Sequence, residues 1–234
     1  MEPEPAARYP YPEWGPGTFL AQLPPELVAE MIALGARRRF DAGQVLLRQG
    51  DRGTHVELLL LGFVKVTTLA GDADTLLSIR MPGELLGETA VLTGAPRNAT
   101  VTACGRVVSV VLAGPAFEGF LRRRPEAMRL VTASVAGQLQ FANRRRTDFG
   151  AYPAHIRLAR VLAEIADGCG RSRADGSVEL GVTLSQPELA TMIGIAQATV
   201  QKAMQELRTR GLIETGYRRL VVCDLPALRA LTNV

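Results

Sequence analysis

The sequence predicts an α+β fold in three parts: an N-terminal β-roll, one long helix and a C-terminal domain of short helices. Three observations predict it. Between Arg37 and Leu112, glycines recur about every ten residues, which is typical of short strands joined by tight turns. A helical period then follows Pro125, and short helices that end at glycines follow Thr183.

The composition is that of a folded chain with room for two modest domains. The chain has 234 residues, of which 47% are hydrophobic, and its net charge of +4 permits a polyanionic partner without requiring one. The longest apolar run, residues 58–64, is far shorter than the roughly 20 residues that span a bilayer. Scattered cysteines without metal-ligand spacing indicate a reduced, cytoplasmic setting: Cys104, Cys169 and Cys223. We therefore expect a cytoplasmic protein that does not enter membranes.

The N-terminal boundaries are predicted from prolines and glycines. Residues 1–18 hold five prolines and no helical or strand period, so we expect a flexible tail. A sensor domain is expected over residues 19–124. It would begin with a helix from Glu26 to Leu34 and continue as a β-roll of the double-stranded, jelly-roll-like type.

Residues 125–149 are predicted to form one long helix. Its apolar and small side chains recur at three- and four-residue steps, at Met128, Val131, Val135, Gln138 and Ala142. A stripe of this width suits a seam between two helices, so we expect a dimerisation helix; the alternative is that the stripe packs only on its own roll. Gly150 is expected to break the helix and act as a hinge.

The last domain, residues 150–234, has the helix caps and turns that predict a winged helix-turn-helix. After a helix over 153–167 and an exposed loop over 168–176, Ser185 and Glu188 have the spacing of a capping box. A second helix should run over 197–210, and two short strands then flank residues 216–219 as a hairpin. A helical hairpin with no nucleic-acid partner is the alternative.

The segment over residues 83–101 has the residue types that grip a sugar phosphate. Glu88 and Arg97 flank a short helix that opens at Gly87. Arginine presents a planar fork to phosphate oxygens, and a carboxylate accepts a hydrogen bond from a ribose hydroxyl. The alternative is an ion pair that only fixes a hairpin.

These segments together resemble the Crp/Fnr family of bacterial transcription regulators. Residues 83–101 resemble the phosphate-binding cassette of that family's cyclic-nucleotide-binding roll, residues 40–51 resemble its opening strands, and residues 182–223 resemble its winged helix-turn-helix. The resemblance implies a homodimer on double-stranded DNA rather than an enzyme, with RNA polymerase as a partner. It also implies a cyclic nucleotide, first of all cyclic AMP, as allosteric ligand between roll and dimer helix, with no metal.

The same resemblance implies particular site residues. The ligand-binding positions are Gly87, Glu88, Thr89, Arg97, Asn98 and Asn143. The DNA-binding positions are Ser185, Gln186, Gln197, Thr199, Gln201, Lys202, Arg218 and Arg219. Two departures stand out. Ala142 lacks the polar group with which cyclic-AMP-responsive members contact adenine, and Gln197-Ala198 replaces the usual Arg-Glu pair, so we expect a different operator.

Rival functions need residues that this sequence supplies poorly. Members of the family that use haem or iron–sulfur clusters need ligands that two histidines and three scattered cysteines do not provide. A metal enzyme built in the roll would need several histidines converging there, and the roll has one, His55. A member with another ligand, or none, stays open.

Overall fold

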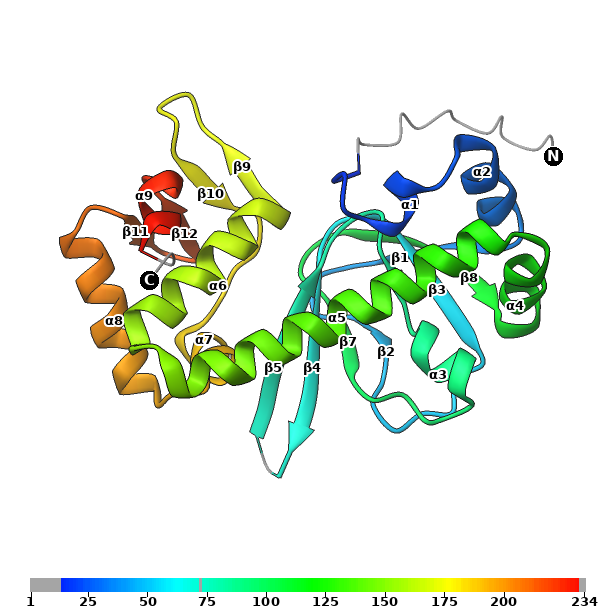
Figure 1. Cartoon of the computed structure of the whole chain (residues 1–234), viewed down its shortest axis with the longest axis horizontal. Helices are drawn as coiled ribbons and strands as arrows, with labels where there is room; N and C mark the ends of the chain where they lie inside the picture. The colour runs from blue at the N-terminus through cyan, green and yellow to red at the C-terminus, as the bar shows by residue number, and fades with distance from the viewer. Residues whose placement is uncertain (1–13, 72, 232–234) are drawn as a thin grey trace.

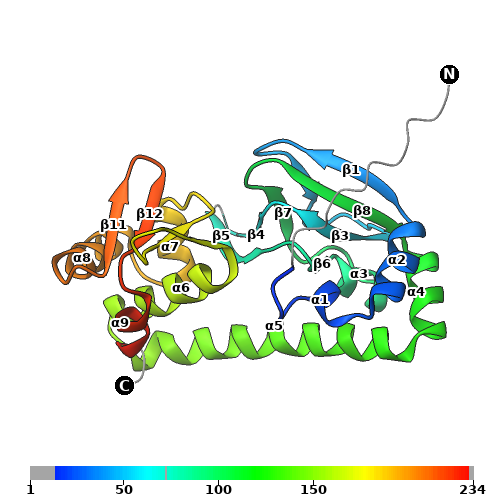
Figure 2. The ribbon, with the colours of Figure 1, turned by 90° about the horizontal axis from the view of Figure 1, so that it is seen from above.

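The computed structural model describes residues 14–71 and 73–231 of the chain. Two lobes are joined by one long helix, α5 (Pro125–Ala151), which contributes to both (Figure 1). A view turned by 90° places the β-roll and the C-terminal lobe on the same side of this helix (Figure 2). The predicted three-part α+β architecture is confirmed.

Two four-stranded antiparallel sheets form the roll. The first has the order β1 (Ala36–Phe40), β8 (Val107–Ala113), β3 (His55–Leu61) and β6 (Leu85–Leu86). The second has the order β2 (Val45–Leu47), β7 (Thr100–Ala103), β4 (Val64–Ala70) and β5 (Ala73–Arg80). Leu59 belongs to the core shared by the two sheets, whereas its neighbours Leu58 and Leu60 belong to a second core under the helices. Successive side chains of a strand point to opposite faces, so β3 is buried on both sides.

Short helices cover the outer face of the first sheet together with the start of α5. They are α1 (Phe19–Gln22), α2 (Pro25–Ala33) and α4 (Gly114–Arg123), while α3 (Glu88–Thr93) follows β6. Phe117 and Phe120 of α4 are fully buried, and Ala127 and Val131 of α5 join the same core. The roll is therefore closed by helices from both ends of the domain.

The predicted flexible tail extends too far. Residues 1–13 lie outside the described residues, but Trp14 and Gly15 are half-buried and Thr18 is buried. Thr18 is only 4% exposed, and its Oγ1 donates a hydrogen bond to the Gly15 carbonyl at 2.8 Å. A Cβ added to Gly83 would clash with Thr18 and Trp14. Proline-rich composition did not indicate this packing, because the contacts are made with residues far along the chain.

The long helix does not break where the sequence predicts. It continues through Gly150, ends at Ala151, and Tyr152 is already extended. Pro153 explains the end, because a residue before proline is disfavoured in the helical region. The joint between α5 and the next helix lies at Tyr152 and Pro153 rather than at Gly150.

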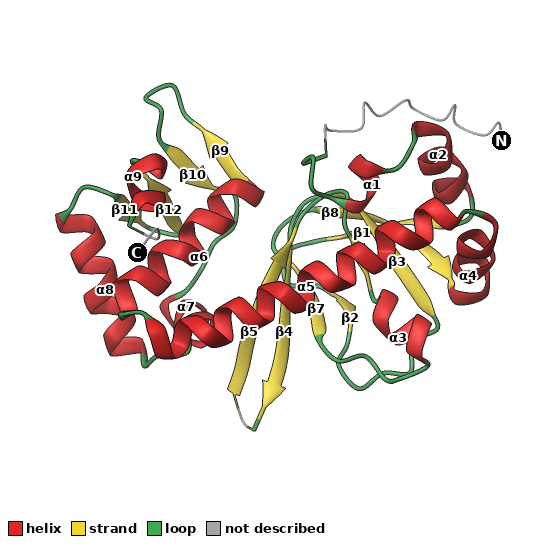
Figure 3. Cartoon of the chain, in the orientation of Figure 1, coloured by secondary structure: helices red, strands yellow, loops and turns green. Residues whose placement is uncertain are grey.

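The C-terminal lobe packs helices on a small sheet, as the colours of Figure 3 show. Its helices are α6 (Ala154–Cys169), α7 (Gln186–Ile193), α8 (Gln197–Thr209) and α9 (Leu225–Ala230). Its strands, in sheet order, are β11 (Ile213–Gly216), β12 (Arg219–Val222), β10 (Val178–Leu180) and β9 (Gly170–Ser172). The predicted loop over 168–176 is wrong in part: β9 pairs with β10, so it is a β-hairpin with an exposed tip.

Candidate ligand cavity and DNA-binding surface

The predicted cassette is built around a glycine that approaches an arginine closely. Gly87 lies between β6 and α3 with φ 80°, a conformation that favours glycine. A Cβ added there would clash with Nη1 of Arg97. Any larger residue would displace the guanidinium, so the sequence needs glycine at this position for two reasons.

Arg97 is held in place by backbone carbonyls. Its Nη1 donates to the Gly87 carbonyl at 2.6 Å and its Nη2 to the His55 carbonyl at 2.5 Å, and the residue is 4% exposed. Burial lowers the pKa of Arg97, and Glu57, Glu88 and Asp51 oppose that effect. A guanidinium has five N–H donors, so this anchoring leaves donors for an anion.

Glu88 connects the cassette to the long helix. It is 4% exposed, and its Oε1 accepts hydrogen bonds from Nε2 of Gln138 at 3.1 Å and from Oγ1 of Thr89 at 3.4 Å. Glu88 and Arg97 are not within ion-pair distance of each other in the described residues. The alternative of a simple Glu88–Arg97 ion pair is therefore not what the geometry shows.

The long helix has two different faces, and the predicted stripe mixed them. Val131 is 1% exposed in the roll core and Gln138 contacts Glu88, so both face the roll. Arg145 continues this face, with its Nη1 donating to the Leu77 carbonyl of β5 at 2.8 Å. Beside this face lie the exposed apolar side chains of Met128, Leu139 and Phe149, which are 38%, 62% and 43% exposed.

One large cavity lies between the roll and α5. Its volume is about 1030 Å³, and Gly87, Glu88, Thr89, Arg97 and Asn98 all line it. This is the upper end of the range for small-molecule sites, roughly 300–1,000 Å³. The structure therefore brings five of the six predicted ligand residues to one wall.

Asn143 is the exception among the predicted ligand residues. It is exposed and does not line the cavity, whereas Phe141 and Ala142 do. Two residues along a helix turn by about 200°, so Asn143 points away from the side that Phe141 presents. Sequence reasoning missed Gln138, although its spacing of seven residues from Val131 places both on one face.

The cavity extends to the C-terminal lobe. Glu164, Ile165, Thr191 and Met192 line its far end together with strand β5. Burial raises the pKa of Glu164, and the nearby Arg145 opposes that rise. One continuous space thus touches the cassette, both strands of the β4–β5 hairpin and the C-terminal helices.

The predicted capping box of α7 is present. Ser185 accepts from the Glu188 backbone N–H, and Glu188 Oε2 accepts from the Ser185 N–H at 2.8 Å. The helix ends at Gly194, φ 66°, and the turn leads directly into α8. The helix-turn-helix is confirmed, and its first helix begins with the hydrogen bonds that the sequence predicts.

The predicted DNA-contact residues of α8 are all exposed. The buried face of α8 comprises Val200, Ala203, Met204 and Leu207. Lys202 lies opposite that face, and Gln197, Thr199 and Gln201 are exposed beside it. Ala196 makes no side-chain cap hydrogen bond, as expected of an alanine at that position.

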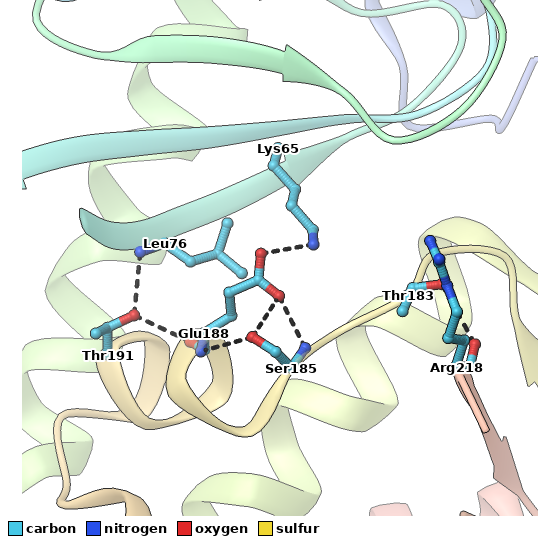
Figure 4. Close-up of polar contacts among 7 residues, drawn as sticks. All are labelled: Lys65, Leu76, Thr183, Ser185, Glu188, Thr191 and Arg218. Carbon is cyan, nitrogen blue, oxygen red and sulfur yellow. Dashed lines mark hydrogen bonds and ion pairs between the residues drawn. The ribbon is translucent and has the colours of Figure 1, made fainter. Parts of the chain in front are cut away.

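The predicted DNA-binding residues outside α8 differ in how free their side chains are to contact DNA. Gln186 is half-buried, and the hydroxyl of Ser185 is used in the capping box. In the hairpin β11–β12, Arg219 lies 4.0 Å from Glu179 of β10, so part of its charge is offset. Arg218 is exposed at the hairpin tip, and its carbonyl accepts from Oγ1 of Thr183 at 3.3 Å (Figure 4).

The roll makes direct contact with the first helix of the helix-turn-helix. Lys65 of β4 lies with its Nζ 2.6 Å from Oε1 of Glu188, the residue that completes the capping box (Figure 4). The backbone N–H of Leu76 in β5 donates to Oγ1 of Thr191 at 3.1 Å, and the Leu76 side chain belongs to the C-terminal core. The two lobes therefore share both a polar contact and a hydrophobic core.

Metal ligation and membrane insertion find no support in the described residues. Within residues 14–71 and 73–231, no group of three or more His, Cys, Asp or Glu residues could hold a metal ion. The cysteines there are free thiols, and burial raises the pKa of Cys104 to about 11 and that of Cys169 to about 12. In the same part of the chain, no helix is long and apolar enough to cross a membrane.

A roll with this cassette, joined through a long helix to a winged helix-turn-helix, defines a class of DNA-binding transcription regulators. Two family models agree with that architecture. The cyclic nucleotide-binding domain matches residues 37–124, and the Crp-like helix-turn-helix domain matches residues 156–231. A Crp-like helix-turn-helix implies DNA binding.

Relatives that align over most of the chain identify its family. It is 30% identical over 200 residues to the transcriptional regulator LdrP of Thermus thermophilus, covering 82% of this chain and 94% of the relative. It is 25% identical over 186 residues to the CRP-like cAMP-activated global transcriptional regulator of Mycobacterium tuberculosis, covering 79% and 83%. The chain belongs to the Crp/Fnr family of transcription regulators.

A solved structure shares the fold. The Crp/Fnr family transcriptional regulator TTHA1359 of Thermus thermophilus superposes with a TM-score of 0.71 at 25% identity, covering 85% of this chain and 99% of that one. The agreement extends over both domains, so the arrangement of roll, long helix and helix-turn-helix is that of a known family architecture.

Proposed function

We propose that this protein is a homodimer whose affinity for operator DNA changes when a cyclic nucleotide binds between the roll and α5. Cyclic AMP is the proposed ligand, and the Mycobacterium tuberculosis relative is named as cAMP-activated. The observation that carries the proposal is the pair of buried charges, Glu88 and Arg97, each 4% exposed on the wall of a large cavity. RNA polymerase is the proposed protein partner, by analogy with the family.

The proposed seat of the ligand uses the donors and acceptors that the cassette presents. The cyclic phosphate would take the remaining N–H groups of Arg97, with Asn98 and Thr89 beside it. A ribose hydroxyl would donate to Glu88, in exchange for the bond that Gln138 donates at 3.1 Å. Ligand binding would then alter a contact between the cassette and α5.

The proposed dimer uses a stripe of α5 that adjoins the cavity. Exposed residues recur there at steps of three and four, as in a two-helix seam. They are Met128, Thr132, Leu139, Ala142, Arg146 and Phe149, with the half-buried Val135 between them, and from Val135 onward these residues also line the cavity. This seam replaces the stripe that the sequence predicted. Asn143, which does not line the cavity of its own chain, could reach a ligand only from a second copy.

Strand β5 offers a route from ligand to DNA. Its residues from Thr75 to Arg80 line the cavity, and its Leu76 is packed in the C-terminal core. A ligand that shifts β5 or α5 would shift the helix-turn-helix. The ligand would change DNA affinity to the extent that it binds one arrangement of the two lobes more tightly than the other.

The test is isothermal titration of the purified protein with cyclic AMP, with cyclic GMP in parallel. We expect saturable binding at about one ligand per chain, lost by at least about 100-fold in Arg97→Leu because a buried phosphate contact disappears. Arg48→Leu, a change of an exposed arginine on the same roll, is the matched control. Unchanged affinity in Arg97→Leu would contradict the proposed seat.

A second candidate is a family member with a different ligand or none. Ala142 lines the cavity without a polar group, and a volume of about 1030 Å³ exceeds what a cyclic mononucleotide fills. The same titration with cyclic di-AMP and cyclic di-GMP separates the two candidates. Heat from a dinucleotide alone would favour this one, whereas heat from cyclic AMP would favour the first.

A further inference from the structure

The tip of the β11–β12 hairpin has an unusual backbone. Gly216 pairs with Arg219, which leaves a two-residue loop of Tyr217 and Arg218. Arg218 has φ 54° and is the one non-glycine residue with positive φ within residues 14–71 and 73–231. Turns of this kind normally place glycine or asparagine there, because a Cβ is unfavourable in that region. The chain keeps an arginine at a position where glycine would relieve strain.

The neighbouring residue, Tyr217, exposes an aromatic ring to solvent. Tyr217 is 92% exposed, so its ring gains nothing from packing within the chain. Strained backbone and exposed aromatic rings concentrate where a partner binds. Two such features on adjacent residues indicate a contact surface rather than a neutral connection between strands.

The tip is held in a defined place beside the helix-turn-helix. Oγ1 of Thr183, two residues before the α7 cap, donates to the Arg218 carbonyl (Figure 4). Nη1 of Arg208 in α8 donates to Oγ1 of Thr215 in β11 at 3.1 Å. The segment before α7 and helix α8 are thus both tied to the hairpin, and Arg218 is exposed at its tip.

The chemistry of the tip fits one part of duplex DNA. When α8 occupies a major groove, an element fixed beside it reaches the phosphate backbone and the adjoining minor groove. That groove is about 6 Å wide, and narrow A·T-rich stretches attract arginine side chains by their negative potential. A two-residue loop is the narrowest tip that two strands allow, and an aromatic ring can pack against the sugars lining the groove.

We propose that Tyr217 and Arg218 read the minor groove beside each major-groove contact, and so favour narrow flanks without the guanine amino group. The inference rests on the proposed DNA-binding function and adds to it. The sequence predicts only that Arg218 is one of the DNA-binding positions, and a contact with the phosphate backbone alone would carry no preference for one flank over another.

The test compares two labelled 30-base-pair duplexes by fluorescence anisotropy at one low salt concentration. One alternates G and C, and the other replaces every guanine by inosine. Inosine keeps the major-groove edge of guanine and lacks the amino group in the minor groove. We expect the wild type to bind the inosine duplex about 3- to 10-fold more tightly, as an A·T-like minor groove allows.

Variants assign that preference to the tip. Arg218→Gly and Tyr217→Ala should bring the ratio of affinities to about one, and Arg218→Gly should keep or raise the melting temperature because glycine relieves the strain. Lys202→Ala, on the opposite exposed face of α8, should weaken both duplexes and keep the ratio. A preserved ratio in Arg218→Gly, or equal affinities of the wild type for the two duplexes, overturns the minor-groove proposal and leaves the DNA-binding function standing. Binding to neither duplex at low salt overturns the DNA-binding function as well.

Discussion

Gln138 donates a hydrogen bond across the gap between α5 and the cassette, to a carboxylate that is 4% exposed. At the scale of single residues, the gathering of Gly87, Glu88 and Arg97 in one place could be predicted, because their residue types and spacing suit a sugar phosphate, and all three line the cavity. Gln138 could not, because a glutamine on a helix fits equally well into a seam, a cavity wall or a solvated face. Only the neighbouring cassette decides between these.

Gln138→Ala should destabilise the protein by about 1–3 kcal/mol, because a buried charged acceptor loses a donor. Thermal unfolding followed by circular dichroism measures the effect. Gln140→Ala, on the exposed side of the same helix, is the control and should change stability by less than about 0.5 kcal/mol. Equal melting temperatures for the two variants would show that the contact with Glu88 is not stabilising.

At the scale of elements, most helices and strands follow from local signals. The capping box of α7, the glycine after α8 and the hairpin β11–β12 form where the sequence places them. The errors occur where tertiary contacts override local signals. Gly150 stays helical and α5 ends just before Tyr152 and Pro153, and β9 forms because it pairs with β10.

The start of α8 offers a gain in stability. Ala196 occupies the N-cap with extended backbone, φ −66° and ψ 147°, and makes no cap hydrogen bond. Ala196→Ser would supply a hydroxyl for an N–H of the first turn, worth about 1 kcal/mol, and should raise the melting temperature by about 2–4 °C. Ala198→Ser, inside the helix, is the control and should not raise it. Calorimetry showing no rise for Ala196→Ser would contradict the interpretation of the cap.

At the scale of the whole molecule, the contact between lobes lies beyond any local pattern. Lys65 and Glu188 are 123 residues apart in the chain. Burial raises the pKa of Glu188, but hydrogen bonds from Lys65 and Ser185 outweigh it, and the pKa lies below its ordinary value of 4.5. A carboxylate with a lowered pKa stabilises the fold above that value, and the stabilisation is lost as the pH falls through the folded-state pKa.

Lys65→Met should lower the melting temperature by about 2–4 °C at pH 7, the effect of losing a half-buried charge-assisted contact of about 1 kcal/mol. The difference from wild type should shrink as the pH falls below about 4.5, where Glu188 becomes protonated. Lys65→Arg, which keeps the charge, is the control. A difference that stays constant from pH 7 to pH 3 would mean that the loss comes from packing rather than from the pair with Glu188.

The unbroken course of α5 has a mechanical consequence. Beyond its end, Arg160 of α6 pairs with Asp148 at 2.7 Å and stacks on Tyr152, and Arg157 donates to the Phe149 carbonyl, so the joint to α6 is braced. A straight helix of 27 residues is about 40 Å long. Acting as a rigid lever, it would turn a tilt of about 5° at the cassette into a displacement of about 3.5 Å at the far end, roughly the rise of one base pair. A movement that is small in the cavity would therefore displace the helix-turn-helix by about the spacing between neighbouring base pairs of DNA.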